Sequence, residues 1–257
     1  MAKKNITLTV AMATYNEAAN IERCLRSVRD IADEIVIVDG GSTDKTVSIA
    51  KKLGATVIST TNPQIFHINK QKALEASHGE WILQMDADET VNESLREEIK
   101  FVMSSHLVPN GYFIPRHNYF LGDWLRKGGQ YPDYVIRLFR NGMGKFPQQS
   151  VHEQIEIEGN VGHLDNALEH YSYTSIPQYW QKSRSYILLS AATLRRKPGN
   201  RSFATAASYM LVRPWMTFFS LFVRHKGFVD GWRGFLFALF SAMHFPKSYL
   251  ESLKSLS

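Results

Sequence analysis

Short apolar runs alternate with segments of helical periodicity along the first hundred residues. The apolar runs read as buried strands and cover residues 8–14, 34–38, 55–59 and 81–85. Apolar positions three and four apart predict helices between these strands and after the last one. Strands that alternate with amphipathic helices are typical of a doubly wound parallel sheet. We therefore predict an α/β, Rossmann-like fold with a mostly parallel sheet and flanking helices.

Local signals also predict where these helices begin and end. Gly54 follows the second helical segment and is a suitable C-cap, while Asp44 precedes that segment as an N-cap. Thr90 and Glu93 form the pattern of a capping box, which predicts that the fourth helix begins after Thr90.

Polar residues follow three of the predicted strands. Tyr15 follows the first strand, and Asp39 ends the second. Asp86 and Asp88 follow the fourth. Ligands of doubly wound sheets bind beyond the carboxyl ends of the strands. Because the chain has neither a glycine-rich dinucleotide loop after its first strand nor a Gly-x-x-x-x-Gly-Lys phosphate loop, a bound diphosphate would need another positive partner.

Asp86 and Asp88 are candidates for holding that partner. Carboxylates two residues apart on extended backbone point the same way and repel each other. Mg²⁺ or Mn²⁺ relieves this repulsion and prefers oxygen ligands. Two incidental acids on a solvated turn are the alternative for an isolated Asp-x-Asp, but the polar ends of the neighbouring strands favour a metal site.

Beyond residue 111 the sequence becomes richer in aromatic residues and in alternating patterns. These patterns predict strands over 111–121, 134–140 and 151–157. Glu153 is the one ionisable residue on the apolar face of the last stretch, and burial would raise its pKa toward the range of a general base. If the strand instead begins after Glu153, the alternation of apolar and polar residues says nothing about the burial of Glu153. Asp133 is the substitute candidate, and the neighbouring His152 is either a metal ligand or a structural histidine.

Composition and charge divide the chain into two parts. It has 257 residues, 44% hydrophobic, and one cysteine, Cys24, so a disulfide framework is excluded and a reducing compartment is indicated. From Lys182 onward there are 12 basic and 2 acidic residues, which leaves 18 of the 30 basic and 22 of the 24 acidic residues in the first part. This split predicts an acidic first part and a basic tail that contacts phosphate or lipid.

The basic segment 195–201 leads into two apolar stretches. Gly234–Phe245 is too short to span a bilayer, which takes about 20 residues. The neighbouring aromatic and basic residues instead suit a helix pair in the membrane interface: Trp215, Phe218, Phe219, Phe222, Phe228, Arg224, His225, Lys226 and Arg233. A helical cap or a dimer interface is the alternative. We expect a catalytic domain over 1–194 and a helical extension over 195–257.

Three motifs of the sequence together resemble those of a known protein family. Thr14-Tyr15-Asn16-Glu17, Val38-Asp39-Gly40-Gly41-Ser42-Thr43-Asp44 and Asp86-Ala87-Asp88-Glu89 resemble, in order and spacing, the family 2 glycosyltransferases of the GT-A fold. With Val151-His152-Glu153, the chain is similar to the lipopolysaccharide core glucosyltransferase subgroup. The resemblance covers roughly the first hundred residues, and the three motifs are specific only jointly.

The resemblance implies a donor site formed by Thr14, Tyr15, Glu17, Asp39, Lys70, Asp86 and Arg137. Tyr15 would lie near the uracil face, and Asp39 would accept a hydrogen bond from the base. Asp86 would face the donor sugar or ribose and would be one of the catalytic residues. Asp88 would hold Mg²⁺ or Mn²⁺, with His152 as a second candidate. Tyr15 as a packing aromatic and Lys70 as a solvated helix residue remain open.

Taken together, we expect an inverting, metal-dependent transfer of a hexose, such as glucose, from a UDP-sugar. The acceptor would be a lipopolysaccharide-core or other lipid-linked saccharide. We expect a cytoplasmic protein, peripheral on the anionic inner face of the cytoplasmic membrane, with no nucleic-acid partner. Glu153 would be the catalytic base, and inversion is implied by the resemblance alone.

Two rivals compete with this interpretation. A sugar nucleotidyltransferase shares the sheet and the acids, but it needs a glycine-rich, arginine-containing loop where this chain has Tyr15-Asn-Glu-Ala18. A non-catalytic membrane-binding protein on a degenerate transferase fold would be expected to have lost one of the acids, and none is missing.

Overall fold

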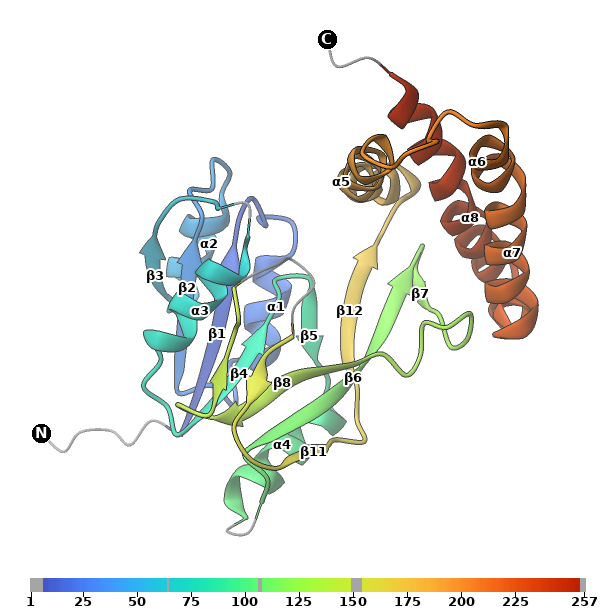
Figure 1. Cartoon of the computed structure of the whole chain (residues 1–257). Helices are drawn as coiled ribbons and strands as arrows, with labels where there is room; N and C mark the ends of the chain where they lie inside the picture. The colour runs from blue at the N-terminus through green and yellow to red at the C-terminus, as the bar shows by residue number, and fades with distance from the viewer. Residues whose placement is uncertain (1–6, 64, 106–107, 149–153, 255–257) are drawn as a thin grey trace, which may run out of the picture. The chain divides into compact units, whose positions relative to one another are not determined.

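The structure of the protein is a computed structural model that describes residues 7–63, 65–105, 108–148 and 154–254 (Figure 1). The chain forms two compact units. The first comprises Met1–Arg116 and Asp133–His170, and the second comprises His117–Pro132 and Tyr171–Ser257. The second unit therefore takes up an internal segment as well as the C-terminal part of the chain.

Four parallel strands form the first part of the sheet. They are β1 (Leu8–Thr14), β2 (Glu34–Asp39), β3 (Thr56–Ser59) and β4 (Trp81–Met85). Their order is β3-β2-β1-β4, and every neighbouring pair is parallel. The helices of this part are α1 (Ile21–Val28), α2 (Thr46–Lys52), α3 (His67–Glu75) and α4 (Glu93–Ser104). The predicted alternation of strands and helices is confirmed.

The sheet continues beyond β4 with antiparallel pairs. β8 (Tyr134–Arg140) pairs with β4, and β6 (Gly111–Phe120) pairs with β8. The order then runs to β12 (Leu168–Tyr173) and β5 (Glu89–Val91). Shorter strands complete the set: β7 (Asp123–Trp124), β9 (Gly144–Lys145), β10 (Glu156–Ile157) and β11 (Val161–His163). The α/β fold class with a mostly parallel sheet and flanking helices is confirmed.

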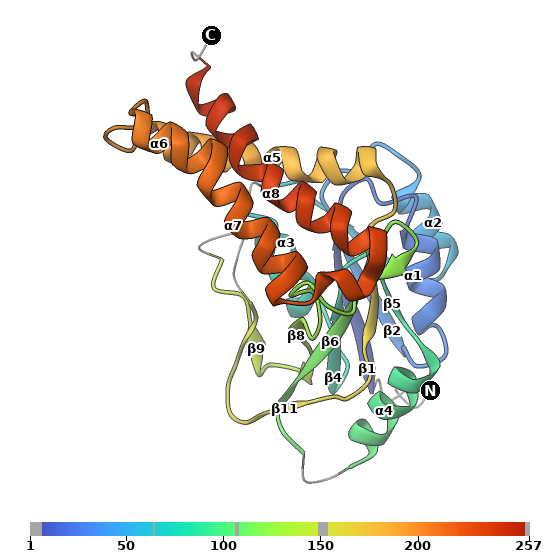
Figure 2. The same ribbon diagram turned by 90° about the vertical axis from the view of Figure 1, so that its right-hand side faces the viewer.

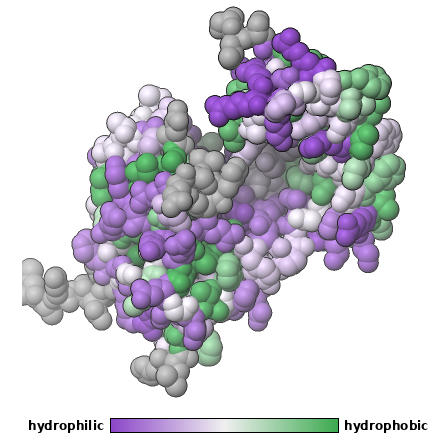
Figure 3. All heavy atoms as spheres, viewed as in Figure 1, coloured by the Kyte–Doolittle hydropathy of each residue, from purple (hydrophilic) through white to green (hydrophobic). Residues whose placement is uncertain are grey.

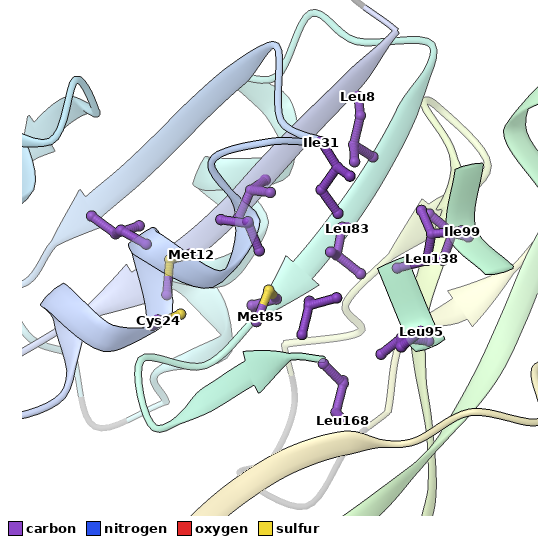
Figure 4. Packing of buried hydrophobic residues seen from close by; sticks show 14 of the residues in the cluster. Leu8, Met12, Cys24, Ile31, Leu83, Met85, Leu95, Ile99, Leu138 and Leu168 are labelled. Carbon is purple, nitrogen blue, oxygen red and sulfur yellow. The ribbon is translucent and has the colours of Figure 1, made fainter. Parts of the chain in front are cut away.

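The alternation of side chains along β1 divides the buried residues between two clusters. Leu8 and Met12 contact apolar residues of α1 and α4, whereas Ala11 belongs to the cluster that includes Leu74 of α3. In Figure 4 the side chains of Leu8, Met12, Leu83 and Met85 lie with those of α1 and α4. Cys24 lies among them and is fully buried, so the one cysteine of the chain is a core residue.

Two local predictions need correction. The capping box is wrong, because Thr90 belongs to β5 and α4 begins at Glu93 with Asn92 as its N-cap. The Asn92 side chain accepts a hydrogen bond from the N–H of Leu95 at 2.9 Å. In the predicted strand 151–157, the described residues form a strand only at Glu156–Ile157, while residues 151–153 lie outside the described part.

The second unit is largely helical. Its longest helices are α5 (Ile176–Arg195) and α8 (Gly231–Leu253). A helical segment between them consists of α6 (Phe203–Ala207), η1 (Ser208–Val212), α7 (Arg213–Phe219) and η2 (Ser220–Arg224), followed by η3 (Gly227–Asp230). α8 packs against both α5 and α7 (Figure 2). Among the described residues, no helix combines the length and the apolar character needed to cross a membrane.

Candidate active site

The carboxyl ends of β1 and β2 are joined through Asp39. Thr14 and Asp39 are register partners, and the Thr14 hydroxyl donates to Asp39 Oδ1 at 3.1 Å. The Ser42 hydroxyl donates to the same oxygen at 2.6 Å. Asp39 Oδ2 accepts the N–H groups of Gly41 at 3.0 Å and Ser42 at 2.8 Å. Asp39 therefore accepts three hydrogen bonds from the β2–α2 loop and one from β1, which together are about the full acceptor capacity of a carboxylate.

A second set of bonds fastens the β1–α1 loop to the β2–α2 loop. Asn16 has a left-handed backbone with φ of 55°, and its side-chain oxygen accepts the N–H of Thr43 at 2.8 Å. The N–H of Glu17 donates to the Thr46 hydroxyl at 2.7 Å. Asp44 accepts the N–H of Thr46 at 2.9 Å, so its carboxylate serves the start of α2 although Lys45 is the N-cap residue. The adjacent Tyr15 is left almost half exposed at this edge.

Both oxygens of Asp86 face cations at the end of β4. Lys70 Nζ of α3 lies 2.5 Å from Asp86 Oδ1, and Arg137 Nη2 of β8 lies 2.6 Å from Oδ2. Arg137 also donates to the side-chain oxygen of Gln84. Lys70 and Arg137 are both buried, so the interpretation of Lys70 as a solvated helix residue is wrong.

Two further acids extend this arrangement through the core. Glu89 Oε1 lies 2.7 Å from Arg137 Nη2 and 3.5 Å from Arg116 Nη1, and the Glu89 side chain is completely buried. Arg116 donates to Asp133 Oδ2 from Nε at 3.0 Å and from Nη2 at 2.7 Å. We call these six side chains the ion network: Lys70, Asp86, Glu89, Arg116, Asp133 and Arg137. Three cations face three carboxylates in it, so its formal charge is balanced.

The ion network shifts the pKa values of Asp86 and Arg137 in opposite directions. Burial alone raises the pKa of Asp86, but Arg137 and then Lys70 outweigh it and hold the pKa of Asp86 well below its usual range. Burial lowers the pKa of Arg137, but Asp86 and Glu89 outweigh it, so the net shift is upward. Asp86 is therefore an ionised carboxylate with both oxygens occupied.

Asp88 lies in a different environment, two residues along the chain. Its Oδ1 is 3.6 Å from Nε2 of His170 on β12, and its side chain is 14% exposed. β5 and β12 bring the two together, because Glu89 and His170 are register partners in that antiparallel pair. A carboxylate oxygen and an imidazole nitrogen thus lie close together just after β4.

The donor set around Asp88 fits a metal ion held partly by its substrate. Within the described part of the chain, no group of three His, Cys, Asp or Glu side chains is placed to hold a metal. Mg²⁺ is commonly bound through one or two carboxylates together with substrate phosphates and water. Asp88 and His170 fit such a site, and the described residues form no closed protein cage around a metal.

The chain is similar in sequence to known proteins. Residues 9–154, more than half of the chain, match the family model of glycosyl transferase family 2. The chain belongs to this family. Over 96% of the chain it is 30% identical to the glycosyltransferase RP128 of Rickettsia prowazekii and covers 88% of that protein. It is 29% identical to LpsC of Rhizobium meliloti, named as a lipopolysaccharide core biosynthesis glycosyltransferase, with 93% of this chain and 89% of LpsC covered.

The chain also aligns in part with solved structures of two other proteins. The crystal structure of S. aureus TarS 1-349 in complex with UDP aligns with 96% of this chain and 89% of that one, at 17% identity and a TM-score of 0.48. The Mycobacterium tuberculosis glucosyl-3-phosphoglycerate synthase with Mn²⁺ and UDP covers 44% of each chain with a TM-score of 0.36.

The structure brings most of the predicted family 2 site residues to one edge of the sheet. Thr14, Tyr15, Glu17 and Asp39 lie at the ends of β1 and β2, and Lys70, Asp86 and Arg137 meet at the end of β4. The predicted catalytic base Glu153 and the predicted metal ligand His152 lie outside the described residues.

Three residues that lie at the site were given no role on the basis of the sequence. Glu89 belongs to the Asp-Ala-Asp-Glu motif, but its burial between two guanidinium groups could not be inferred from the motif. Arg116 and His170 come from distant strands, and only the pairing of those strands brings them near the acids.

Proposed function

We propose that this family 2 transferase moves a hexose from a UDP-sugar to a saccharide acceptor with the help of Mg²⁺ or Mn²⁺. One observation carries the proposal. Lys70 and Arg137 neutralise Asp86, while Asp88 lies toward a histidine and keeps partial exposure at the carboxyl edge of the parallel strands. This edge is where sheets of this kind bind nucleotides.

The residues at this edge divide the work of holding the donor. Tyr15, which is exposed beside the β1–α1 loop, would lie against the uracil ring. Asp39 would exchange one of its loop hydrogen bonds for the base. Asp88 and His170 would hold the divalent cation, which when bound neutralises charge on the departing diphosphate. Lys70 lies next to Asp86 and would add a second positive charge near the phosphates.

Glu153 remains our proposed general base, and Asp133 remains the alternative. An acceptor hydroxyl must lose a proton as it attacks the anomeric carbon, and a positioned carboxylate typically contributes about 10²–10⁴-fold to such a step. Arg116 fastens Asp133 through Oδ2, which orients this carboxylate. Attack opposite the leaving diphosphate would invert the anomeric configuration, an outcome that we infer from the family alone.

We infer the acceptor class from the relatives and from the second unit. The similarity to LpsC favours a lipopolysaccharide-core or other lipid-linked saccharide. Such an acceptor would be met at the inner face of the cytoplasmic membrane, where anionic lipid attracts basic segments. The basic and aromatic second unit would then keep the enzyme at that surface.

An exposed apolar surface on the second unit supports this membrane proposal. Six side chains between residues 211 and 223 are each more than half exposed and recur at helical spacing; we call them the outer face: Leu211, Val212, Trp215, Met216, Phe219 and Val223. Phe218 and Phe222 instead contact Phe235 of α8, with ring centroids 5.5 and 5.7 Å apart. Hydrophobic residues also gather over α6 and α7 in Figure 3. An apolar face with basic neighbours suits a helix lying in the membrane interface.

Donor hydrolysis tests the enzymatic proposal. The full chain would be incubated with a panel of nucleotide sugars, with and without Mn²⁺, and the released nucleotide identified. We expect UDP release from one UDP-hexose, dependent on the cation. Release of inorganic diphosphate from UTP and a sugar phosphate would instead identify a nucleotidyltransferase. No turnover with any donor in the presence of membrane acceptor extracts would contradict the enzymatic proposal.

A further inference from the structure

The second unit contains a cavity that has no part in the donor site. It lies where the end of α5 turns into α6, and its volume is about 280 Å³. Nine residues line it: Leu194, Lys197, Pro198, Asn200, Ala204, Thr205, Ser208, Tyr209 and Arg213. Two of them are cationic and none is acidic, so the lining favours an anion.

Arg213 is held in a fixed orientation at this cavity. Its guanidinium lies over the Tyr209 ring, 4.4 Å from the centroid, and its Nε donates to the Ser208 hydroxyl at 3.2 Å. Among the described residues, neither terminal nitrogen of Arg213 has a hydrogen-bond partner, and the same is true of Lys197 Nζ. A guanidinium that is already oriented loses little freedom when it binds phosphate through both terminal nitrogens.

The residues next to the cavity in the sequence are apolar and exposed. Phe203 precedes the lining residue Ala204 and is 88% exposed. Leu211 and Val212 lie between the lining residues Tyr209 and Arg213 and begin the outer face. An anion-binding cavity with an apolar border is complementary to a ligand that has a phosphate group at one end and hydrocarbon at the other.

We propose that this cavity binds the phosphate headgroup of an anionic membrane lipid, through Lys197 and Arg213, while Phe203 and the outer face enter the membrane interface. The proposal rests on the membrane association proposed above and adds a defined lipid site to it. In the proposed site Lys197 and Arg213 bind the phosphate. In diffuse attraction all the basic residues of the second unit would contribute alike.

Matched charge variants of the full chain separate a site from diffuse attraction. Lys197→Gln with Arg213→Gln removes two charges from the cavity, while Arg196→Gln with Arg201→Gln removes two charges from the same segment without touching the lining. If the attraction is diffuse, the loss of each basic residue near the membrane surface weakens partitioning by about fivefold. Loss of charge-assisted hydrogen bonds adds about tenfold or more.

Co-sedimentation with phosphatidylcholine vesicles, with and without phosphatidylglycerol, is the measurement. We expect the cavity pair to lose at least about tenfold more binding to anionic vesicles than the control pair. Arg213→Lys should lie between the wild type and Arg213→Gln, because it keeps the charge and loses the planar fork. Equal losses in both pairs would overturn the lipid site and leave diffuse attraction.

Two further outcomes would also overturn the proposal. If calorimetry shows that glycerol phosphate and inorganic phosphate bind as tightly as the headgroup does on vesicles, the cavity is a site for free phosphate. If the wild type binds no anionic vesicle, the membrane association itself fails. Donor hydrolysis, measured on the same preparations, keeps either failure distinct from a failure of the proposed transferase activity, and circular dichroism verifies that each variant is folded.

Discussion

Asp86 and Asp88 belong to one motif but have different basic neighbours. Asp86 has a cation on each carboxylate oxygen, within 2.6 Å, and its side chain is 27% exposed. Asp88 Oδ1 lies 3.6 Å from Nε2 of His170. A divalent cation at Asp86 would have to displace Lys70 or Arg137, which supports our proposal that Asp88 is the metal ligand.

This contrast predicts different consequences for the two asparagine variants. Asp88→Asn should abolish the dependence of UDP affinity on Mn²⁺ and leave the free energy of unfolding within about 1 kcal/mol of the wild type. Asp86→Asn should lower that free energy by about 3 kcal/mol, the low end for a broken buried ion pair, because Asp86 keeps some exposure. Calorimetry and urea unfolding are the measurements. Unchanged Mn²⁺-dependent UDP binding in Asp88→Asn would refute the metal role.

The pKa of Asp86 predicts how stability responds to acid. Because the pKa is depressed in the folded protein, the carboxylate stabilises the fold above its unfolded value, near pH 4, and this contribution is lost as the pH falls through the folded pKa. The free energy of unfolding of the wild type should therefore fall below about pH 4. Asp86→Asn should fall less steeply over the same range. Parallel curves for the two proteins, measured by urea unfolding, would show that Asp86 has no such role.

The sequence identified the acidic residues at the carboxyl ends of the parallel strands, but it did not identify the side chains that contact them. Strand ends and the family resemblance pointed to Asp39, Asp86 and Asp88, since the carboxyl ends of adjacent parallel strands meet at one edge. Neither pointed to Arg116 or His170. These residues reach the acids through antiparallel pairing between segments that lie far apart in the chain, and a single sequence carries no pattern for such pairing.

At the scale of elements, the site depends on how firmly the loops after β1 and β2 are held. Asp39 joins β2 to its own loop and, through Thr14, to β1. The two loops are also fastened to each other through Asn16 and Thr43. A carboxylate that already accepts four bonds can serve the nucleotide base directly, or it can act only by keeping the loop in shape.

Two variants separate these roles of Asp39. Asp39→Ala should weaken uridine binding by about 1.5–3 kcal/mol, the value of a charge-assisted hydrogen bond, with a smaller effect on inorganic diphosphate. Ser42→Ala is the control, because it removes a loop bond at 2.6 Å and keeps the carboxylate. We expect little loss of uridine affinity in Ser42→Ala. If both variants lose the same affinity, Asp39 only holds the loop.

The strand and helix predictions were most accurate where local pattern and burial agree. β1 and β4 have the predicted bounds, since each is a mainly apolar run buried inside the sheet. The capping box was misleading because Thr90 pairs with Glu169 in β5 and β12, and α4 therefore begins at Glu93 instead of directly after Thr90. Here a tertiary strand pairing overrides a local helix signal.

At the scale of the whole molecule, the two units do not follow the boundary expected near residue 194. The segment His117–Pro132 belongs to the second unit, and long-range bonds within that unit explain why. Asp230 accepts the N–H groups of Arg126 and Lys127, each at 2.9 Å. Composition changes near residue 195, but these contacts cross more than a hundred residues, and composition does not reveal them.

The outer face gives the prediction that tests the second unit as a membrane-binding element. Trp215→Glu with Phe219→Glu places two charges on residues that are more than half exposed, so the fold should be unaffected. Binding to anionic vesicles should fall by at least about thirtyfold, because about 2 kcal/mol or more of apolar burial is lost. Co-sedimentation measures the loss, and circular dichroism verifies the fold.

Phe101→Glu is the matched control for this double variant. Phe101 is 73% exposed on α4 of the first unit, so its substitution makes the same chemical change away from the outer face. Vesicle binding of Phe101→Glu should equal that of the wild type. If the double variant binds vesicles normally but changes from dimer to monomer in light scattering, the outer face is a contact between copies of the chain. Exposed apolar faces commonly contact lipid or protein, and these two measurements distinguish the two.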